Sequence, residues 1–206
     1  MAITERTVPS HTGVASHTVA SHTVASHTGR ATLADAQRMA AEGEGLIPGG
    51  DGRPSRKFLR VRIGKTPLAL PLEGVREVLP CPPRTRLYRL DAIVVGLCAV
   101  RGDIVAILDL DPVAPLETTD RANAPWLAVL HEGERTCGIL AHEMMGIATV
   151  EAGAIAPLVS AGGEAEAYLE GALPADGPLP PMGILRVGAW MGQARVRRLA
   201  GEEVSG

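Results

Sequence analysis

The chain has 206 residues, which suits one ordinary domain or two small ones with a sizeable core. Apolar residues make up 46% of it but aromatic residues only 2%, so the core must be aliphatic. No apolar run reaches the roughly 18 uninterrupted residues of a membrane span, and no secretory leader is evident, so we expect a cytoplasmic protein without direct membrane insertion. The three cysteines include no CxxC pair and predict neither a disulfide framework nor a zinc site.

The N-terminal part of the chain differs in composition from the rest. Residues 14–28 are three tandem copies of VASHT, a polar repeat that cannot bury enough apolar surface to offset chain entropy. Its histidine spacing matches no ligand motif, so we expect no metal site there. A capping pattern predicts a short helix over residues 32–42. We expect residues 1–56 to be a disordered tail and linker, and residues 201–206 to be a short C-terminal tail.

The ordered region is expected to begin near Phe58. Apolar residues alternate with arginines over residues 59–63, which predicts a half-buried strand, and a second strand is predicted over residues 68–72 after a glycine turn. Leu72, Val75 and Leu79 then recur at helical spacing. This spacing predicts a single short helix before Pro80.

Residues 93–110 read IVVGLCAVRGDIVAILDL, two apolar runs separated by one polar turn. Such runs around a glycine turn predict a β-hairpin, and because both faces of each run are apolar we expect it to be buried on two sides. Cys98 lies inside it and is predicted to be a core residue, as is Cys137 further on. Arg101 at the tip is directed toward solvent or a partner, and as an exposed charge it should contribute little to stability.

The same order of elements returns in the second half. Strands are predicted over residues 126–130 and 137–141 around a glycine turn, followed by a helical stretch at residues 142–146 and a further strand over residues 147–150. The glycine pattern of the hairpin recurs in a weaker form near residues 171–177.

Three prolines follow this recurring pattern, so we expect its last strand to be an edge strand or to contain a bulge: Pro178, Pro180 and Pro181. Two related β units of about 70 residues therefore predict two small barrels or pseudo-barrels. Residues 189–199 are expected to close the domain as a helix, with Trp190 on its buried side.

Charge is distributed unevenly along the chain. Residues 56–101 carry ten basic and three acidic residues, whereas residues 102–194 carry three basic and thirteen acidic ones. Either these are the solvated faces of two substructures, or the two halves present opposite potentials to different partners. Nucleic-acid binding is not expected, because the basic segment has little aromatic interleaving and no recognisable binding motif.

The sequence contains no nucleophile motif, phosphate loop or dinucleotide fingerprint, so we expect no enzymatic activity and no cofactor. Asp109 and Asp111 have the spacing of a paired-carboxylate or metal site, but a strand end turning outward before Pro112 explains them more simply. Met144 and Met145 fit core filling or an adaptable protein-binding groove.

The hairpin VVGLCAVRGDIVAILDL at residues 94–110 resembles the signature hairpin of the CheW family of chemotaxis coupling proteins. The segments FLRVRIGKTPLALPLEGVREVL at residues 58–79 and WLAVLHEGERTCGILAHEMMGIATV at residues 126–150 are similar to the opening units of its two barrels. The resemblance runs in order over residues 58–191. It implies an all-β fold with short helices: two interlocked five-stranded barrels over residues 57–200, closed by a C-terminal helix.

The resemblance also implies a non-catalytic adaptor that joins the cytoplasmic tips of methyl-accepting chemoreceptors to the regulatory domain of a CheA-type histidine kinase, in receptor arrays at the inner membrane. Arg101 matches the hairpin arginine of that family. The positions that match its receptor or kinase contacts are Val75, Glu77, Gly96, Trp126 and Ile147.

This sequence departs from the Asn-Leu-Arg-Gly turn of the family, because it has Ala99 in place of the asparagine. This departure leaves open a divergent kinase-binding protein of a surface-motility or other regulatory pathway, or a domain that binds a kinase without a receptor. A small metal-dependent hydrolase using Asp109 and Asp111 is the remaining alternative.

Overall fold

The computed structural model describes residues 47–48, 54–87, 91–158, 163–193 and 196. The tail expected over residues 1–56 lies largely outside these residues. The helix expected over residues 32–42 and the tail expected over residues 201–206 lie wholly outside them. The division of the chain into tail and domain therefore remains a prediction.

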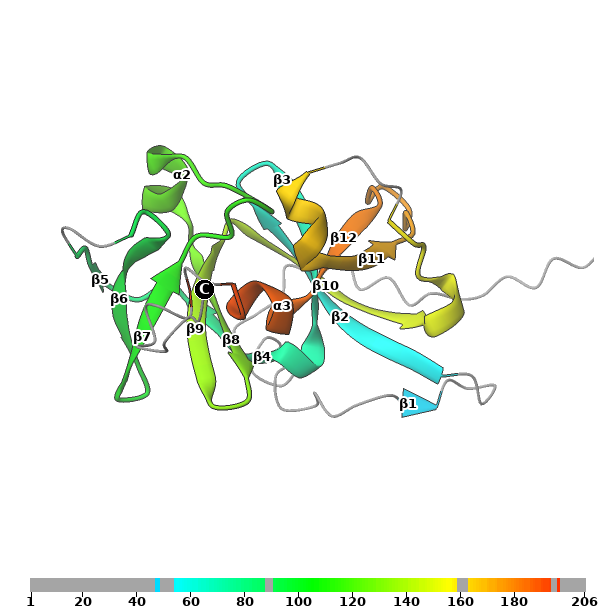
Figure 1. Cartoon of the computed structure of the whole chain (residues 1–206), viewed down its shortest axis with the longest axis horizontal. Coiled ribbons are helices and arrows are strands. Elements are labelled where there is room, and N and C mark those ends of the chain that lie inside the picture. The colour runs from blue at the N-terminus through cyan, green and yellow to red at the C-terminus, as the bar shows by residue number, and fades with distance from the viewer. Residues whose placement is uncertain (1–46, 49–53, 88–90, 159–162, 194–195, 197–206) are drawn as a thin grey trace, which may run out of the picture.

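The described chain forms two sheets with a few short helices, which confirms the all-β class (Figure 1). The first sheet contains β1 (Ile47–Pro48), β2 (Pro54–Ile63), β3 (Thr66–Pro71), β10 (Glu143–Glu151), β11 (Leu169–Leu173) and β12 (Met182–Leu185). The second contains β4 (Val75–Pro80), β5 (Arg84–Thr85), β6 (Val94–Val100), β7 (Asp103–Leu108), β8 (Trp126–Glu132) and β9 (Arg135–Ala141). The helices are the 3-10 turns η1 (Leu72–Gly74), η2 (Ala152–Ala154) and η3 (Glu164–Tyr168), and the α-helices α2 (Thr118–Asn123) and α3 (Val187–Met191).

Each half of the chain contributes strands to both sheets: the β2–β3 hairpin lies between β10 and β12 of the second half, and the β8–β9 hairpin lies between β4 and β7 of the first half. β4 follows β3 in the chain but pairs with β8, and β10 follows β9 but pairs with β2. The remaining strands repeat one arrangement, because β12 runs parallel to β3 as β7 runs parallel to β9. The two β units of the sequence are therefore interlocked, because the opening hairpin of each half pairs on both sides with strands of the other half.

The strand order also suggests how each sheet curves. β4 and β5 are separated only by Cys81, Pro82 and Pro83, yet they lie at opposite ends of the second sheet. In the first sheet, an isolated bridge from Ala156 to Ala172 joins the segment after β10 to β11. These links favour a curled, barrel-like form. The five-stranded barrels themselves remain a prediction.

Two predicted helices are strands in the structure. Only η1 precedes β4 where a helix was expected over residues 72–79, and β10 replaces the helical stretch expected at residues 142–146. Both strands contain a register shift, in β4 between Val75 and Glu77 and in β10 between Met144 and Gly146. A bulge inserts one residue, so inward positions fall three apart and imitate helical spacing.

The β6–β7 hairpin is not buried on both sides. Ile104 is 77% exposed, and Ala99, its cross-strand partner, is also exposed. The hairpin lies toward one end of the second sheet, so only its inner face, with Cys98, Val100 and Val105, packs into the core. The prediction of two buried faces is wrong because an apolar side chain in a sequence does not reveal what covers it.

The C-terminal elements also differ from expectation. The prolines precede β12 rather than interrupting it, and β12 lies between β3 and β11, so it is not an edge strand. The pairing of β11 with β12 does contain a register shift, between Leu169 and Gly171. α3 begins before the helix expected over residues 189–199, Trp190 is fully buried on it, and Val196 is also helical. Residues 194–195 and 197–199 lie outside the described residues.

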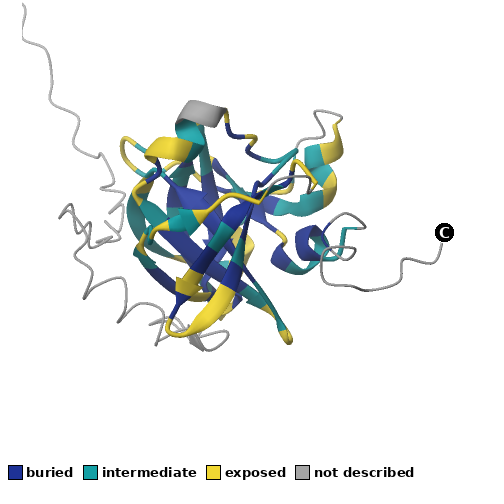
Figure 2. Ribbon diagram, turned by 90° about the vertical axis from the view of Figure 1, so that its left-hand side faces the viewer, coloured by how far each residue is buried: buried dark blue, intermediate teal, exposed yellow. Residues whose placement is uncertain are grey.

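The main core runs through both sheets, as the buried strands of Figure 2 show. It combines residues such as Val61 and Leu68 of the first sheet with Leu127 and Ile139 of the second. A smaller cluster surrounds Phe58. Both sheets share this core because each half of the chain contributes strands to both of them. Neither sheet buries its apolar side chains without the other.

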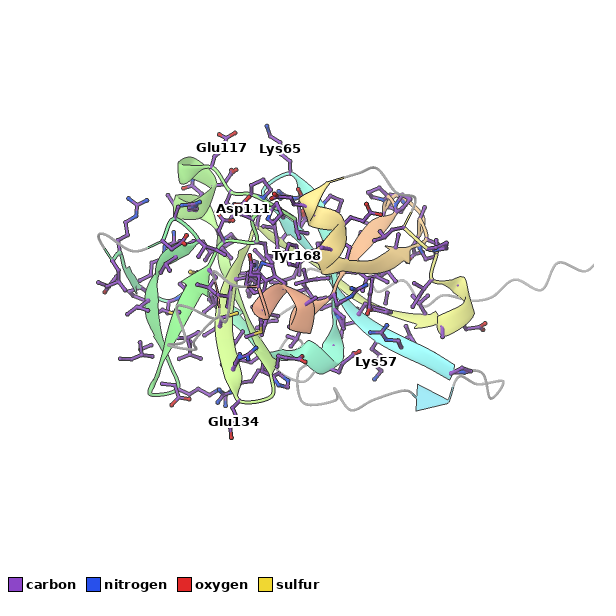
Figure 3. The ribbon with its side chains drawn as sticks, viewed as in Figure 1. Lys57, Lys65, Asp111, Glu117, Glu134 and Tyr168 are labelled. Atoms are coloured by element: carbon purple, nitrogen blue, oxygen red, sulfur yellow. The ribbon has the colours of Figure 1, made fainter. Side chains whose placement is uncertain are left out.

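Three smaller expectations concern side chains. Cys98 and Cys137 are buried, and burial raises the pKa of Cys137 to about 12, so they behave as core residues. Met144 and Met145 are half-buried against the two clusters, which favours core filling. The glycine turn between β8 and β9 is also present, and Glu134 projects from it into solvent (Figure 3).

Candidate protein-interaction site

Arg101 occupies a two-residue turn between β6 and β7. Its φ is 52°, and that of Gly102 is 96°, so both turn residues have positive φ as a tight hairpin requires. For a residue with a Cβ this conformation costs about 1 kcal/mol. Arg101 is the only non-glycine with positive φ in the described part of the chain.

Two ion pairs join this turn to β4. The Nε of Arg101 donates to Oε2 of Glu77 at 2.9 Å, and the Arg101 side chain is 65% exposed whereas that of Glu77 is 9% exposed. Beside it, Arg76 and Asp103 pair at 3.5 Å, with both side chains well exposed. Because β8, β9 and β7 separate β4 from β6 in the sheet, these contacts require the sheet to curl around.

Gly96 and Val75 are interior residues. A Cβ on Gly96 would lie 2.7 Å from the carbonyl oxygen of Thr85, so glycine allows β5 to approach β6 closely. Val75 is buried on β4, two residues before Glu77. Both positions shape the hairpin and β4 rather than presenting a side chain to a partner.

Trp126 and Ile147 lie elsewhere. Trp126 is half-buried on β8 and pairs with Pro80, at the far end of β4 from Val75. Ile147 is half-buried on β10 of the other sheet. The structure therefore brings together Arg101, Glu77 and Val75 but leaves the other predicted contacts at separate places.

The sequence interpretation missed the exposed neighbours of Arg101, namely Arg76, Asp103 and Ile104. The turn sequence identifies Asp103 as polar, but nothing in it shows that β4 lies alongside. The exposure of Ile104 could not be read from the sequence either, because its run is as apolar as a buried strand.

The equivalent turn of the first sheet carries the opposite charge. Asp176 lies beside Gly177, whose φ is 56°, and accepts a hydrogen bond from Nη1 of Arg60 on β2 at 2.7 Å. The Asp176–Arg60 pair and the Arg101–Glu77 pair thus each tie a hairpin turn to a strand of its own sheet, with acid and base interchanged. Of the two turns, only the one between β6 and β7 presents an arginine.

The uneven charge of the chain is largely satisfied within the molecule. Three arginines of β2 pair with acidic residues of the second half: Arg56 with Glu170 at 2.7 Å, Arg60 with Asp176 at 2.7 Å, and Arg62 with Glu143 at 3.0 Å. These pairs hold the strand between its neighbours. Part of the basic charge of residues 56–101 is therefore neutralised within the molecule.

Asp109 does not turn outward after β7. It is 2% exposed and forms an ion pair with Arg121 of α2. Burial raises the pKa of Asp109 above its ordinary 3.8, and the charge of Arg121 opposes that rise. Within the described ranges, no group of three or more His, Cys, Asp and Glu side chains could hold a metal ion.

His142 connects three elements. Its Nδ1 accepts the backbone N–H of Gly64 at 3.0 Å, so its Nε2 carries the proton and donates to the carbonyl of Asp120 at 3.0 Å. The imidazole thus joins the β2–β3 turn, the start of β10 and α2. This is a structural role rather than that of a catalytic base.

Residues 57–193 match the model of the CheW-like domain, and the chain belongs to that family. It is 27% identical over 148 residues to Protein FrzA of Myxococcus xanthus, an alignment that covers 72% of this chain and 92% of that protein. Its fold is similar to the crystal structure of the scaffolding protein TtCheW from Thermoanaerobacter tengcongensis, with a TM-score of 0.56 and 14% identity, over 68% of this chain and 94% of that one. No helix in the described ranges is long and apolar enough to cross a membrane.

Proposed function

We propose that this chain is a non-catalytic adaptor that couples chemoreceptors to a CheA-type histidine kinase in the cytoplasm. The observation that carries the proposal is the family match over residues 57–193, which includes the hairpin that presents Arg101. Arg101 engages Glu77 through Nε alone, so its two Nη groups remain able to bind a carboxylate or carbonyl of a partner. These two Nη donors would fix the orientation of the partner, while burial of apolar surface would supply the affinity.

A second candidate is a kinase-binding protein of a divergent, non-chemotactic pathway. Ala99 stands where the family resemblance places an asparagine, and Ala99 is an exposed strand residue beside Arg101. A partner would therefore meet a methyl group where an amide is usual.

The decisive experiment measures binding and kinase control separately. The purified chain is titrated into each CheA-type kinase encoded in the source genome, and kinase autophosphorylation is then followed with and without receptor-containing membranes. A coupler binds the kinase and makes its activity respond to the receptor. Binding without receptor response favours the kinase-binding alternative, and failure to bind every such kinase refutes both.

A further inference from the structure

His142 is the single residue between two strands that belong to different sheets. β9 ends at Ala141 in the second sheet, and β10 begins at Glu143 in the first. The backbone N–H of His142 donates to the carbonyl of Arg62 on β2 at 2.8 Å, which fixes the main chain at this crossing. A side chain at such a point is well placed to connect the two sheets.

The imidazole of His142 makes this connection through α2. Its Nδ1 accepts the N–H of Gly64, in the turn between β2 and β3, at 3.0 Å, and its Nε2 donates to the carbonyl of Asp120 at 3.0 Å. α2 is in turn held to the second sheet, because its Arg121 pairs with Asp109 directly after β7. One ring therefore bonds the β2–β3 turn of the first sheet to a helix that is anchored on the second.

Only the neutral ring can make both hydrogen bonds. The N–H of Gly64 can only donate, so Nδ1 must offer a lone pair, and an imidazolium has none because both of its nitrogens carry protons. Gly64 is buried, so water does not readily replace the lost acceptor. A second proton on the ring therefore leaves two N–H groups facing each other, and the turn must separate from the ring.

The charged groups around the ring come from each element that meets there. Arg62 of β2 donates through Nη1 to the carbonyl of Gly64 at 2.7 Å, and its Nε pairs with Glu143 of β10 at 3.0 Å. On α2, a carboxylate oxygen of Asp120 would lie 3.6 Å from a Cβ on Gly64. Because Glu143 is paired with Arg62, a charged ring is held by α2 while it repels the N–H of the turn. Two further charged side chains near this junction project into solvent (Figure 3): Lys65 and Glu117.

We propose that His142 is a pH-sensitive link between the two sheets. With one proton, its ring holds the β2–β3 turn against α2. With a second proton, it releases the turn, while Nε2 keeps its hydrogen bond to the carbonyl of Asp120. Histidine side chains change charge between about pH 5 and pH 8, so acidification within this range loosens the contact between the sheets. The inference goes beyond the adaptor function and does not depend on which partners the chain binds.

Amide hydrogen exchange of the full chain, followed by NMR and corrected for the intrinsic exchange rate, tests the link. Between about pH 7.5 and about pH 5.5, the protection of the Gly64 N–H is expected to fall about fivefold or more, as the loss of one hydrogen bond implies. The N–H of Ala156, which donates to the backbone carbonyl of Ala172 at 2.9 Å, is the internal control. Its protection should change less than about twofold, because its acceptor does not titrate.

Two variants show whether the pH dependence belongs to His142. His142→Asn places an amide oxygen close to the position of Nδ1, where it accepts the N–H of Gly64 at any pH, so the protection of Gly64 should no longer depend on pH. His131→Asn removes the other histidine of the described ranges, which is also half-buried, and should keep the wild-type dependence.

Nitrogen chemical shifts of the His142 ring in the wild-type protein give a second measurement that needs no variant. They should report an unprotonated Nδ1 at about pH 7.5 and two protonated nitrogens at about pH 5.5. A ring that stays neutral at the lower pH, a proton on Nδ1 at the higher pH, or unchanged protection of Gly64 would each refute the link. An equal loss of protection in His142→Asn and wild type would also refute it, because another group would then control the turn.

Discussion

The guanidinium of Arg101 lies beside a carboxylate that is almost buried, whereas its neighbour Arg76 pairs with an exposed one. An exposed ion pair is screened by water and contributes little to stability. A carboxylate near the interior depends more on its partner, because losing that partner leaves a charge that water solvates poorly. The burial of Glu77 therefore leads us to expect a larger contribution of Arg101 to stability than the small one predicted for an exposed tip charge.

We therefore expect Arg101→Ala to lower the free energy of unfolding by about 1 kcal/mol, and Arg76→Ala to lower it by less than about 0.5 kcal/mol. Urea titration of both variants measures the difference. The two pairs join the same turn to the same strand and differ mainly in burial, so each serves as the other's control. Equal losses would show that Glu77 does not depend on Arg101.

Asp109 provides a second prediction, on pH. Because its folded pKa is raised above 3.8, the folded protein holds this proton to higher pH than the unfolded chain does. Stability from this group is therefore present at low pH and is lost as pH rises through the raised folded pKa. One buried oxygen, Oδ1, has no hydrogen-bond partner among the described residues, which is consistent with a carboxylate that ionises with difficulty.

Asp109→Asn removes the titration while keeping an oxygen for Arg121. We expect the stability of wild type relative to the Asn variant to fall as pH rises from the ordinary pKa of 3.8 through the raised folded pKa, and then to level off. Urea unfolding across this range measures the trend. A relative stability that rises with pH would mean that Arg121, rather than burial, dominates the site.

Elements far apart in the chain meet at His142. Its Nδ1 accepts a hydrogen bond from the buried N–H of Gly64, and its Nε2 donates one to the carbonyl of Asp120. Replacement by alanine leaves both groups without a partner, and we expect His142→Ala to lower the free energy of unfolding by about 1–3 kcal/mol.

His131 offers a matched control for this variant. It is also half-buried, on β8, and no hydrogen bond between described residues involves its ring. We expect His131→Ala to change stability by less than about 0.5 kcal/mol. Equal effects of the two variants in thermal or urea unfolding would contradict the bridging role of His142.

At the scale of the whole molecule, the exchanged strands make the halves interdependent. The first half alone, residues 54–124, contains β2 and β4 without their partners β10 and β8. Its β2 arginines also lose Glu143, Glu170 and Asp176. We expect this fragment to be unfolded by circular dichroism and to fold when co-expressed with residues 125–206. Cooperative unfolding of the fragment alone would contradict the interlocked arrangement.

The sequence by itself determined the hairpins. The β2–β3, β6–β7 and β8–β9 pairs are joined by short glycine turns, and their alternation and turn chemistry act between neighbours in the chain. The order of these units also sufficed to indicate the family. Arg101 was correctly placed at an exposed turn, because the turn residues themselves dictate its position.

Only the tertiary structure decided which strands exchange, which face of the β6–β7 hairpin is covered, and that Glu77 lies beside Arg101. β4 and β10 gain their hydrogen bonds from the opposite half of the chain, and their bulges conceal the strand period. Ile104 is exposed on β7, whereas α3 packs against β8. Local patterns carry no information about such long-range packing, because an apolar residue in the sequence does not indicate whether a helix or a partner protein covers it.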